Sequence, residues 1–228
     1  MSIITVERKV LKKNDDLAAE NRAYFALRRT FAVNLLSSPG SGKTSLLERT
    51  IDALKHELRI AIIEGDVQTD NDARRIAAHG VPVAQIVTNG LCHLEASLVQ
   101  SALPQLPEDM ELCVIENVGN LVCPASYDLG EHMKITIVST TEGDDKPLKY
   151  PAMFRRSSVL IVNKIDLLPY VQFSVDACIA NAHGVNPGLL VFTTSCSSGE
   201  GIDAWCDWLR DRVRELRDEP APGAALPA

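Results

Sequence analysis

The segment from Ser37 to Thr44 has the residue types needed to bind a nucleotide phosphate. It reads Ser-Ser-Pro-Gly-Ser-Gly-Lys-Thr and matches the phosphate-loop pattern G-x-x-x-x-G-K-[ST] except at the first position, where Ser37 replaces Gly. Gly40 and Gly42 allow the backbone to approach, so that N–H groups and the following helix N-terminus can bind the anion. We expect Lys43 to reach the β- and γ-phosphates and Thr44 to ligate Mg²⁺. The residues expected to hold the phosphates are Gly40, Ser41, Gly42, Lys43, Thr44 and Ser45.

Acidic residues at the ends of two apolar runs are candidates for the second contact to Mg²⁺. Glu64 and Asp66 follow one run, and Glu116 ends another and begins Glu-Asn-Val-Gly. That segment has the shape of D-x-x-G, which senses the γ-phosphate in such proteins, with Glu in place of Asp. We favour Asp66 near the metal or the attacking water and Glu116 as an acid behind it, although the roles could be exchanged. With Lys43, these two are the predicted catalytic residues.

A second motif indicates which base is bound. Asn163-Lys-Ile-Asp follows an apolar strand-like run and resembles the N-K-x-D guanine-recognition motif of GTPases. Asp166 would accept hydrogen bonds from guanine N1 and N2, an arrangement that adenine cannot complete. Asn163 would hold the loop and touch the base edge, while the Lys164 stem packs along the ring. Ser195 and Cys196 resemble the last base-contacting loop, where a backbone amide meets guanine O6.

The six cysteines are expected to be reduced thiols, because nothing in the sequence suggests secretion. Their positions divide them into two groups. Apolar or helical patterns surround Cys113, Cys178 and Cys206, which predicts that these three pack in the core. Loops or element ends contain Cys92, Cys123 and Cys196.

Three of the loop residues have the chemistry of metal ligands. Cys92 and His93 follow Thr88-Asn-Gly and open a predicted helix, and Cys123 lies just beyond the predicted γ-phosphate sensor. Cysteine and histidine suit Zn²⁺ or Ni²⁺, but three ligands leave a tetrahedral site open. A symmetric dimer would complete it with the same residues from each subunit. Spacing alone leaves a second interpretation open, in which the thiols are buried or incidental and the histidine is solvated.

These residues require a fold that brings the ends of several strands together. The apolar runs are separated by loops or by stretches long enough for helices, which favours a largely parallel sheet covered on both sides. The predicted fold is therefore α/β, a doubly wound and largely parallel sheet with helices on both faces. The predicted strands are Phe31–Ser37, Ile60–Ile63, Val83–Val87, Leu112–Ile115, Ile135–Val138, Val159–Val162 and Leu189–Phe192.

The chain is predicted to contain one domain with an extension at each end. Residues 1–30 form an N-terminal helical extension, residues 31–217 the phosphate-loop domain, and residues 218–228 a disordered tail rich in Pro and Ala. Leu17, Tyr24 and Leu27 lie near helical spacing in the extension, with Asn14 or Asp15 available as the N-cap. A final helix is expected from residue 202 to residue 216.

Composition excludes several classes of partner. The 228 residues carry a net charge of -7, and no Lys/Arg block suggests binding to nucleic acid or to a membrane surface. No run of apolar residues is long enough to span a bilayer, and the first residues do not have the pattern of a secretion signal. We therefore expect a cytoplasmic protein without nucleic-acid or membrane partners.

Together the motifs resemble the HypB family of hydrogenase nickel-incorporation GTPases, and the resemblance extends over nearly the whole chain to about Leu216. It implies a GTP-regulated metallochaperone that binds GTP or GDP with Mg²⁺ and forms a homodimer with GTP. It also implies work with a HypA-like nickel and zinc protein and nickel delivery, direct or indirect, to the large subunit of [NiFe]-hydrogenase. The segments that carry it are residues 14–22, 37–44, 64–73, 89–96, 116–124 and 163–166.

The resemblance also places a shared interfacial Ni²⁺ or Zn²⁺ site on Cys92, His93 and Cys123. The sequence departs from some members in having neither an N-terminal cysteine motif nor a His-rich tract, which puts a high-affinity nickel store in doubt. Because Cys123 is seven residues from Glu116, movement of the sensor on hydrolysis would also move a metal ligand.

Three alternatives stay open at this stage. A related metallochaperone GTPase for urease, like UreG, or for a cobalamin enzyme would share the phosphate loop and base motif. A nucleotide-gated scaffold would bind GTP and metal but barely hydrolyse GTP. Slow hydrolysis is expected in any case, because no arginine finger is identified and Arg155 and Arg156 are expected on the surface of a helix. A phosphate-loop kinase would need an acceptor site and has no use for N-K-x-D.

Overall fold

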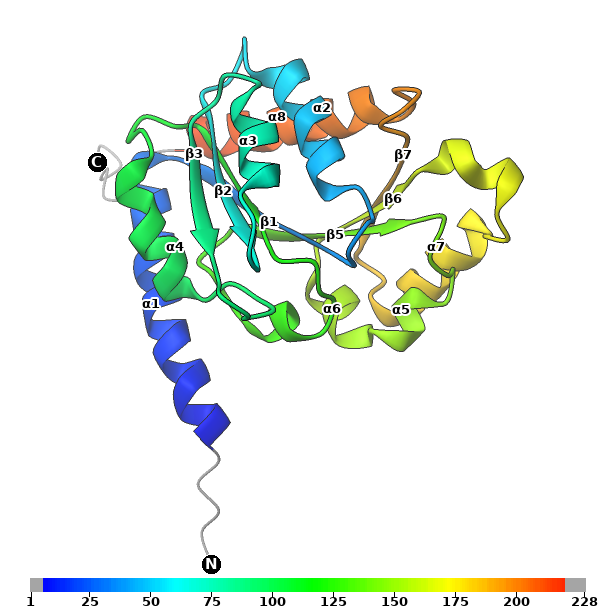
Figure 1. Cartoon of the computed structure of the whole chain (residues 1–228), viewed down its shortest axis with the longest axis horizontal. Helices are drawn as coiled ribbons and strands as arrows, with labels where there is room; N and C mark the ends of the chain where they lie inside the picture. Colours follow the sequence, from blue (N-terminus) through cyan, green and yellow to red (C-terminus); the bar gives the residue numbers. More distant parts are fainter. Residues whose placement is uncertain (1–5, 220–228) are drawn as a thin grey trace, which may run out of the picture.

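Seven parallel strands form one sheet in the part of the chain that the structure describes (Figure 1). The computed structural model describes residues 6–219, with side chains from residue 11 onward. The strand order is β3-β2-β4-β1-β5-β6-β7, and every neighbouring pair is parallel. The predicted doubly wound α/β fold and all seven predicted strands are confirmed. The strands are β1 (Phe31–Ser37), β2 (Ile60–Asp66), β3 (Val83–Val87), β4 (Leu112–Glu116), β5 (Met133–Ser139), β6 (Val159–Asn163) and β7 (Leu190–Thr194).

Helices cover both faces of this sheet because its strands are apolar on both sides. In β1, Val33 and Leu35 pack in one buried cluster, whereas Ala32 and Leu36 pack in clusters on the opposite face. The first face is covered by α2 (Lys43–Leu54), α3 (Asn71–Ala77) and α8 (Ile202–Asp218). The opposite face is covered by α1 (Val6–Arg28), α4 (Ala96–Ala102), α6 (Pro151–Arg156) and α7 (Val175–Val185), with α5 (Lys146–Lys149) beside α7.

The parallel arrangement brings the carboxyl ends of the strands to one edge of the sheet, where open α/β sheets bind ligands. The strand register aligns the residues that end these strands. Glu64 of β2 lies opposite Glu116 of β4, and Asn163 of β6 lies between Ser139 of β5 and Thr194 of β7. The predicted phosphate, base and sensor residues therefore lie on neighbouring loops.

The last helix fixes the helix that follows the phosphate loop. Trp205 of α8 is almost fully buried, and its indole Nε1 donates a hydrogen bond of 2.9 Å to Thr50 Oγ1 of α2. The Trp205 ring also packs against Phe192 and Trp208. Because buried aromatic side chains with satisfied polar atoms stabilise strongly, α8 holds α2 and its N-terminus in place.

The N-terminal helix differs from its prediction. It already begins at Val6, so the prediction that Asn14 or Asp15 caps its N-terminus is wrong. Asn14 instead lies inside the helix, buried, and its Nδ2 donates to the Asp128 carbonyl. Leu27 is also not on the buried face, since 75% of its surface is exposed. The stripe that packs on the domain is Asn14, Ala18, Asn21 and Phe25.

The buried stripe of α1 includes asparagines because two asparagines of this helix bind backbone groups of the domain. Asn21 donates to the carbonyls of Ala96 and Leu129, and Asn14 accepts from the Ala96 amide. A buried amide that satisfies backbone groups is stable in a position that hydrophobic periodicity assigns to an apolar residue. Tyr24 does pack against the core, as its spacing suggests, but hydrophobic spacing alone did not identify Asn14 and Asn21 as buried residues of α1.

At the other end, α8 extends to Asp218, two residues beyond the prediction. The predicted tail falls mostly on residues 220–228, which lie outside the described residues. No helix within residues 6–219 has the length and apolar character that crossing a bilayer requires.

Candidate functional site

The phosphate loop has the geometry that its sequence predicts. It lies between β1 and α2, and Gly40 and Gly42 have φ angles of 77° and 93°, in the left-handed region that favours glycine. No side chain caps the N-terminus of α2, which leaves its first amides available to an anion. A cavity of about 520 Å³ lies over this loop. Its lining includes every residue predicted to hold phosphate, namely Gly40, Ser41, Gly42, Lys43, Thr44 and Ser45.

Glu116, rather than Asp66, lies against the residue predicted to ligate Mg²⁺. The Thr44 hydroxyl donates a hydrogen bond of 2.8 Å to Glu116 Oε1, and Lys43 Nζ is 3.8 Å from the same oxygen. Burial raises the pKa of Glu116, while Lys43 and Thr44 act in the opposite direction. Asp66 lines the cavity but accepts hydrogen bonds from the backbone amides of Gln68 and Thr69. Although burial acts to raise it, those bonds lower the pKa of Asp66.

Two further acids complete a cluster beside the loop. Carboxylate oxygens of Glu64, Asp66 and Asp72 lie within 4.8 Å of one another. Burial, followed by the charges of Glu116 and Asp66, raises the pKa of Glu64 to about 8. Its Oε2 atom is buried and has no hydrogen-bond partner among the described residues, as is also true of Glu116 Oε2. Buried oxygens with unused lone pairs beside Thr44 fit a hard, oxygen-binding cation such as Mg²⁺.

Arg75 of α3 also lines this cavity, although no sequence motif pointed to it. Its guanidinium forms ion pairs with Glu48 at 2.8 Å and Asp72 at 3.0 Å, and its Nη2 is 3.5 Å from Ser45 Oγ. Its place on the helix that follows β2 gave no signal of this contact. Arg155 and Arg156 are exposed at the end of α6, as expected.

Two residues that follow β5, Glu142 and Lys146, form hydrogen bonds with the phosphate loop. The sequence motifs did not identify them. Ser41 Oγ donates a hydrogen bond of 2.6 Å to Glu142, and Lys146 Nζ donates one of 3.0 Å to Ser38 Oγ. Glu142 and Lys146 are themselves 3.0 Å apart. Although burial opposes it, the bonds from Ser41, Ser139 and Lys146 lower the pKa of Glu142. Their place after a parallel strand was the available signal, because such residues reach the same edge of the sheet.

The residues predicted to read the base converge in a second cluster. Asn163 Nδ2 donates to the Ser41 carbonyl at 3.0 Å, which joins the base motif to the phosphate loop. Lys164 has a left-handed backbone, and its Nζ donates to the Gly40 carbonyl. Ser195 Oγ donates to Asp166 at 2.5 Å.

The remaining contacts fix Asn163 itself. Thr194 Oγ1 donates to Asn163 Oδ1 at 3.1 Å, and the Cys196 thiol lies 3.5 Å from the same oxygen. All the base-motif residues are thus held in place by neighbours before any ligand arrives. Gly42 is part of the same packing, because a Cβ there would lie 2.5 Å from Asn163 Nδ2.

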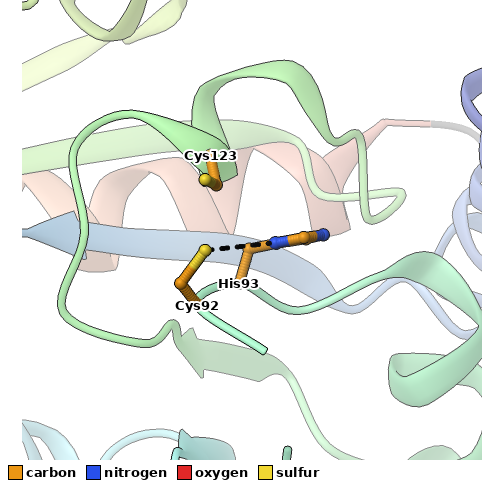
Figure 2. Close-up of side chains that lie close together, drawn as sticks. All are labelled: Cys92, His93 and Cys123. Carbon is orange, nitrogen blue, oxygen red and sulfur yellow. Dashed lines mark hydrogen bonds between the residues drawn. The ribbon is translucent and has the colours of Figure 1, made fainter. Parts of the chain in front are cut away.

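Cys92, His93 and Cys123 come together at a third point (Figure 2). One potential ligand atom from each lies within 4.8 Å of the others, and Cys92 Sγ is 3.8 Å from His93 Nδ1. Figure 2 shows Cys92 and His93 on one segment and Cys123 on the short helix, Cys123–Ser126, that faces it. The predicted helix at Cys92 is wrong, because α4 begins only at Ala96. Two sulfurs and an imidazole nitrogen fit a borderline cation such as Ni²⁺ or Zn²⁺.

The histidine of this group is held by its surroundings. The rings of His93 and Tyr127 lie 4.0 Å apart, and His93 Nε2 is 3.7 Å from Glu95 Oε1. Burial lowers the pKa of His93, against the effect of Glu95, and so favours the neutral form that ligates metals. A hydrogen bond shared with the Cys123 thiol, followed by burial, raises the pKa of Cys92. Metal binding at this site would therefore release a proton from Cys92.

The other thiols behave as predicted from their positions. Burial is the first cause that raises the pKa of each core thiol to about 12. These residues pack as small hydrophobic side chains. They are Cys113 of β4, Cys178 of α7 and Cys206 of α8.

Comparisons with known proteins agree with this geometry. Residues 31–193 match the family described as CobW/HypB/UreG, nucleotide-binding domain. The chain is 53% identical over 208 residues to the hydrogenase maturation factor HypB of Escherichia coli K12, a match that covers 91% of this chain and 72% of that protein. It is 42% identical over 214 residues to the hydrogenase/urease maturation factor HypB of Helicobacter hepaticus, which covers 92% and 88% of the two chains.

A solved structure gives the same result in three dimensions. The crystal structure of HypB from Helicobacter pylori in complex with nickel superimposes with a TM-score of 0.85 at 36% identity. The match covers 94% of this chain and all of that one. The similarity thus includes α1 and α8 as well as the sheet and its loops.

Proposed function

This chain belongs to the HypB hydrogenase maturation factors of the CobW/HypB/UreG family of P-loop GTPases, and from that premise we propose that it uses GTP to control the handling of nickel. The observation that carries the proposal is the position of Glu116 and Cys123. Glu116 contacts Thr44 in the phosphate site, and Cys123 lies in the metal-ligand group seven residues later. One short loop therefore joins the nucleotide site to the metal site.

Nucleotide binding follows from the fixed donors of the phosphate loop. The amides at the α2 N-terminus and the Lys43 ammonium would neutralise the phosphate oxygens. Thr44, Asp66 and Glu116 would hold Mg²⁺, which supplies charge stabilisation on the transferring phosphoryl group. Of the two acids, Glu116 already contacts Thr44, so we assign it the closer role and Asp66 the position beside the attacking water.

Guanine selection would come from Asp166, with Asn163 and Lys164 holding the loop. The Ser195 amide donates to the Glu200 carbonyl, so the expected amide contact to guanine O6 falls to Cys196. Turnover is expected to be slow, because Arg75, the arginine that lines the phosphate cavity, is engaged by Glu48 and Asp72.

We further propose that Cys92, His93 and Cys123 bind Ni²⁺ or Zn²⁺ at the interface of a homodimer that forms with GTP. Three ligands leave a tetrahedral site incomplete, and a second subunit would supply what is missing. The metal would arrive from a HypA-like nickel and zinc protein and pass, directly or indirectly, to the large subunit of [NiFe]-hydrogenase in the cytoplasm. Because the Helicobacter hepaticus relative is named for both hydrogenase and urease maturation, urease is the second candidate client.

The test is equilibrium Ni²⁺ and Zn²⁺ binding together with measurement of mass. Wild type is compared with Cys92→Ala, His93→Ala and Cys123→Ala, each with GDP and with a non-hydrolysable GTP analogue. His56→Ala is the matched control, because His56 is exposed and lies away from the group of ligands.

We expect all three ligand variants to lose metal binding, His56→Ala to keep it, and the wild type to dimerise with the analogue. Unchanged metal binding in the ligand variants would reduce these residues to packing positions. It would leave a GTPase of the HypB family whose metal site lies elsewhere.

A further inference from the structure

Two side-chain amides connect the metal-ligand segment, residues 91–94, to the sensor loop, residues 116–120. Asn117 Oδ1 accepts hydrogen bonds from the Leu94 amide at 3.1 Å and from its own neighbour, the Val118 amide, at 2.9 Å. Asn120 Nδ2 donates a hydrogen bond of 3.2 Å to the Cys92 carbonyl. The sensor loop thus contacts the backbone on both sides of His93.

The orientation of Asn117 is fixed by its other contacts. The side chain is almost fully buried, and its Nδ2 donates to Asn34 Oδ1 of β1 at 3.2 Å. Its backbone amide donates to the Leu35 carbonyl at 3.1 Å. An amide with donors on one side and an acceptor on the other cannot rotate without leaving buried polar groups unpaired, which costs about 1–3 kcal/mol for each group.

Asn117 follows directly after the residue that contacts the phosphate site. In extended backbone, successive side chains point to opposite faces. Glu116 accordingly faces Thr44 in the phosphate site, whereas Asn117 faces Leu94 on the other side of the sheet. A movement of the backbone that displaces one of these side chains must displace the other.

Leu94 is held on its second side by the end of β2. It is fully buried, and a Cβ on Gly65 would lie 2.8 Å from its methyl groups. Gly65 directly precedes Asp66, an acid that lines the phosphate cavity. Leu94 therefore packs between the ends of the two strands whose acids face the nucleotide.

We infer that Asn117 is a positioning residue that transmits the nucleotide state from Glu116 to Cys92 and His93. The inference rests on the proposed function and deepens it, since it concerns two of the three ligands of the same metal site. Cys123 comes shortly after the sensor loop in the sequence. Cys92 and His93 are joined to the same loop by hydrogen bonds of Asn117 and Asn120. All three ligands thus move with one loop, and a change at Glu116 alters the geometry of the whole group.

The experiment compares Ni²⁺ affinity in two nucleotide states. The Ni²⁺ dissociation constant is measured by competition with a chromophoric chelator, with GDP and with a non-hydrolysable GTP analogue, and the nickel–thiolate charge-transfer spectrum is recorded in each state. The variants are Asn117→Ala and Asn120→Asp, which keeps the acceptor for the Val122 amide but removes the donor to Cys92. The matched control is Asn21→Ala, which removes another buried amide, bonded to the carbonyls of Ala96 and Leu129, without touching Asn117 or Leu94.

We expect the two dissociation constants of the wild type to differ by about tenfold, within the usual range of coupling between sites. In Asn117→Ala the two Ni²⁺ dissociation constants should differ by no more than about twofold, and the spectra should be similar in both nucleotide states. The GDP affinity of this variant should stay within about twofold of wild type. Asn120→Asp should lower the ratio of the two Ni²⁺ dissociation constants at least about twofold, and Asn21→Ala should keep it.

If the ratio of the two Ni²⁺ dissociation constants in Asn117→Ala equals that of the wild type, the inference is overturned and the proposed function still stands. If Asn117→Ala does not fold, the same result in Asn120→Asp overturns the inference. Loss of the ratio in Asn21→Ala as well also overturns it, because the loss of any buried amide would then have the same effect. Equal Ni²⁺ dissociation constants in the two nucleotide states of the wild type would overturn the link between nucleotide and metal binding itself.

Discussion

At the scale of single residues, the position of Glu116 decides how the phosphate site is built. The strand register places it opposite Leu35 of β1 and Glu64 of β2, at the centre of the sheet. Its contact with Thr44 gives it the place that D-x-x-G acids are expected to take near the metal, and the longer Glu side chain reaches it from the last residue of β4. The substitution of Asp by Glu in the motif is therefore compatible with the same role.

We predict that Glu116→Gln slows GTP hydrolysis by about 10- to 100-fold, because it removes a negative charge beside Thr44 while the amide oxygen still accepts the Thr44 hydrogen bond. Single-turnover phosphate release measured across a Mg²⁺ titration checks this, and a higher Mg²⁺ requirement is expected. Asp66→Asn serves as the comparison. A larger Mg²⁺ effect in Asp66→Asn than in Glu116→Gln would exchange the two roles.

At the scale of elements, α1 is held to the domain by buried hydrogen bonds as well as by the buried ring of Phe25. Asn21 is buried, and its Nδ2 serves two carbonyls on different segments. Gly130 lies under the same helix, where a Cβ would meet the Ala18 carbonyl at 2.6 Å. The next residue of the helix, Arg22, pairs with Asp128 at 2.7 Å, with both side chains about half exposed.

We predict that Asn21→Ala lowers the free energy of unfolding by about 2–4 kcal/mol, because it removes two buried hydrogen bonds, to the carbonyls of Ala96 and Leu129. Arg22→Ala is the matched control, since an exposed ion pair contributes only about 0–1 kcal/mol. Urea denaturation followed by tryptophan fluorescence measures both. Equal losses in the two variants would show that the buried amide does not hold α1.

His132 lies where β1 and β5 begin, and we expect its protonation to destabilise the fold. Its Nδ1 accepts a hydrogen bond of 3.0 Å from the Ala32 amide, which requires the neutral ring. Burial is the main cause that lowers the pKa of His132, Arg22 adds to it, and Glu131 and Glu219 act in the opposite direction.

Because the folded-state pKa is lowered, the neutral ring stabilises the fold above the ordinary pKa of about 6.5, and this stability is lost as the pH falls below that value. We predict that His132→Asn, which keeps an acceptor for Ala32, reduces the loss of stability between about pH 7 and pH 5. Urea denaturation at several pH values measures it. A pH dependence equal to that of wild type would assign the acid sensitivity to other groups.

The sequence predicted the sheet well because each strand is a continuous apolar run, and a run of this kind has few alternatives in a chain of alternating strands and helices. It also predicted the loop that contains Gly40, Gly42 and Lys43, because the spacing of these residues is imposed by local backbone geometry. The burial of Asn14 and Asn21 in α1 was missed because their partners are distant in sequence. Contacts between distant segments have no local pattern, which is also why Arg75 was missed. Glu142 did have a signal in its place after β5.

At the scale of the whole molecule, the metal-ligand group lies at the surface beside exposed apolar side chains. Leu91 and Val122 directly precede Cys92 and Cys123, and 61% of the surface of Val122 is exposed. An apolar surface around an incomplete set of ligands is suited to contact with a second copy of the chain.

We predict that Val122→Asp lowers the population of the proposed GTP-dependent homodimer at least about tenfold, because a charge within an apolar contact costs about 1.4 kcal/mol or more to desolvate. Light scattering with the GTP analogue and Ni²⁺ measures the mass. Leu27→Asp is the matched control, because Leu27 is equally exposed and apolar but lies on α1. If Leu27→Asp blocked dimerisation and Val122→Asp did not, the contact between subunits would lie on α1, and the three ligands would have to bind the metal within one subunit.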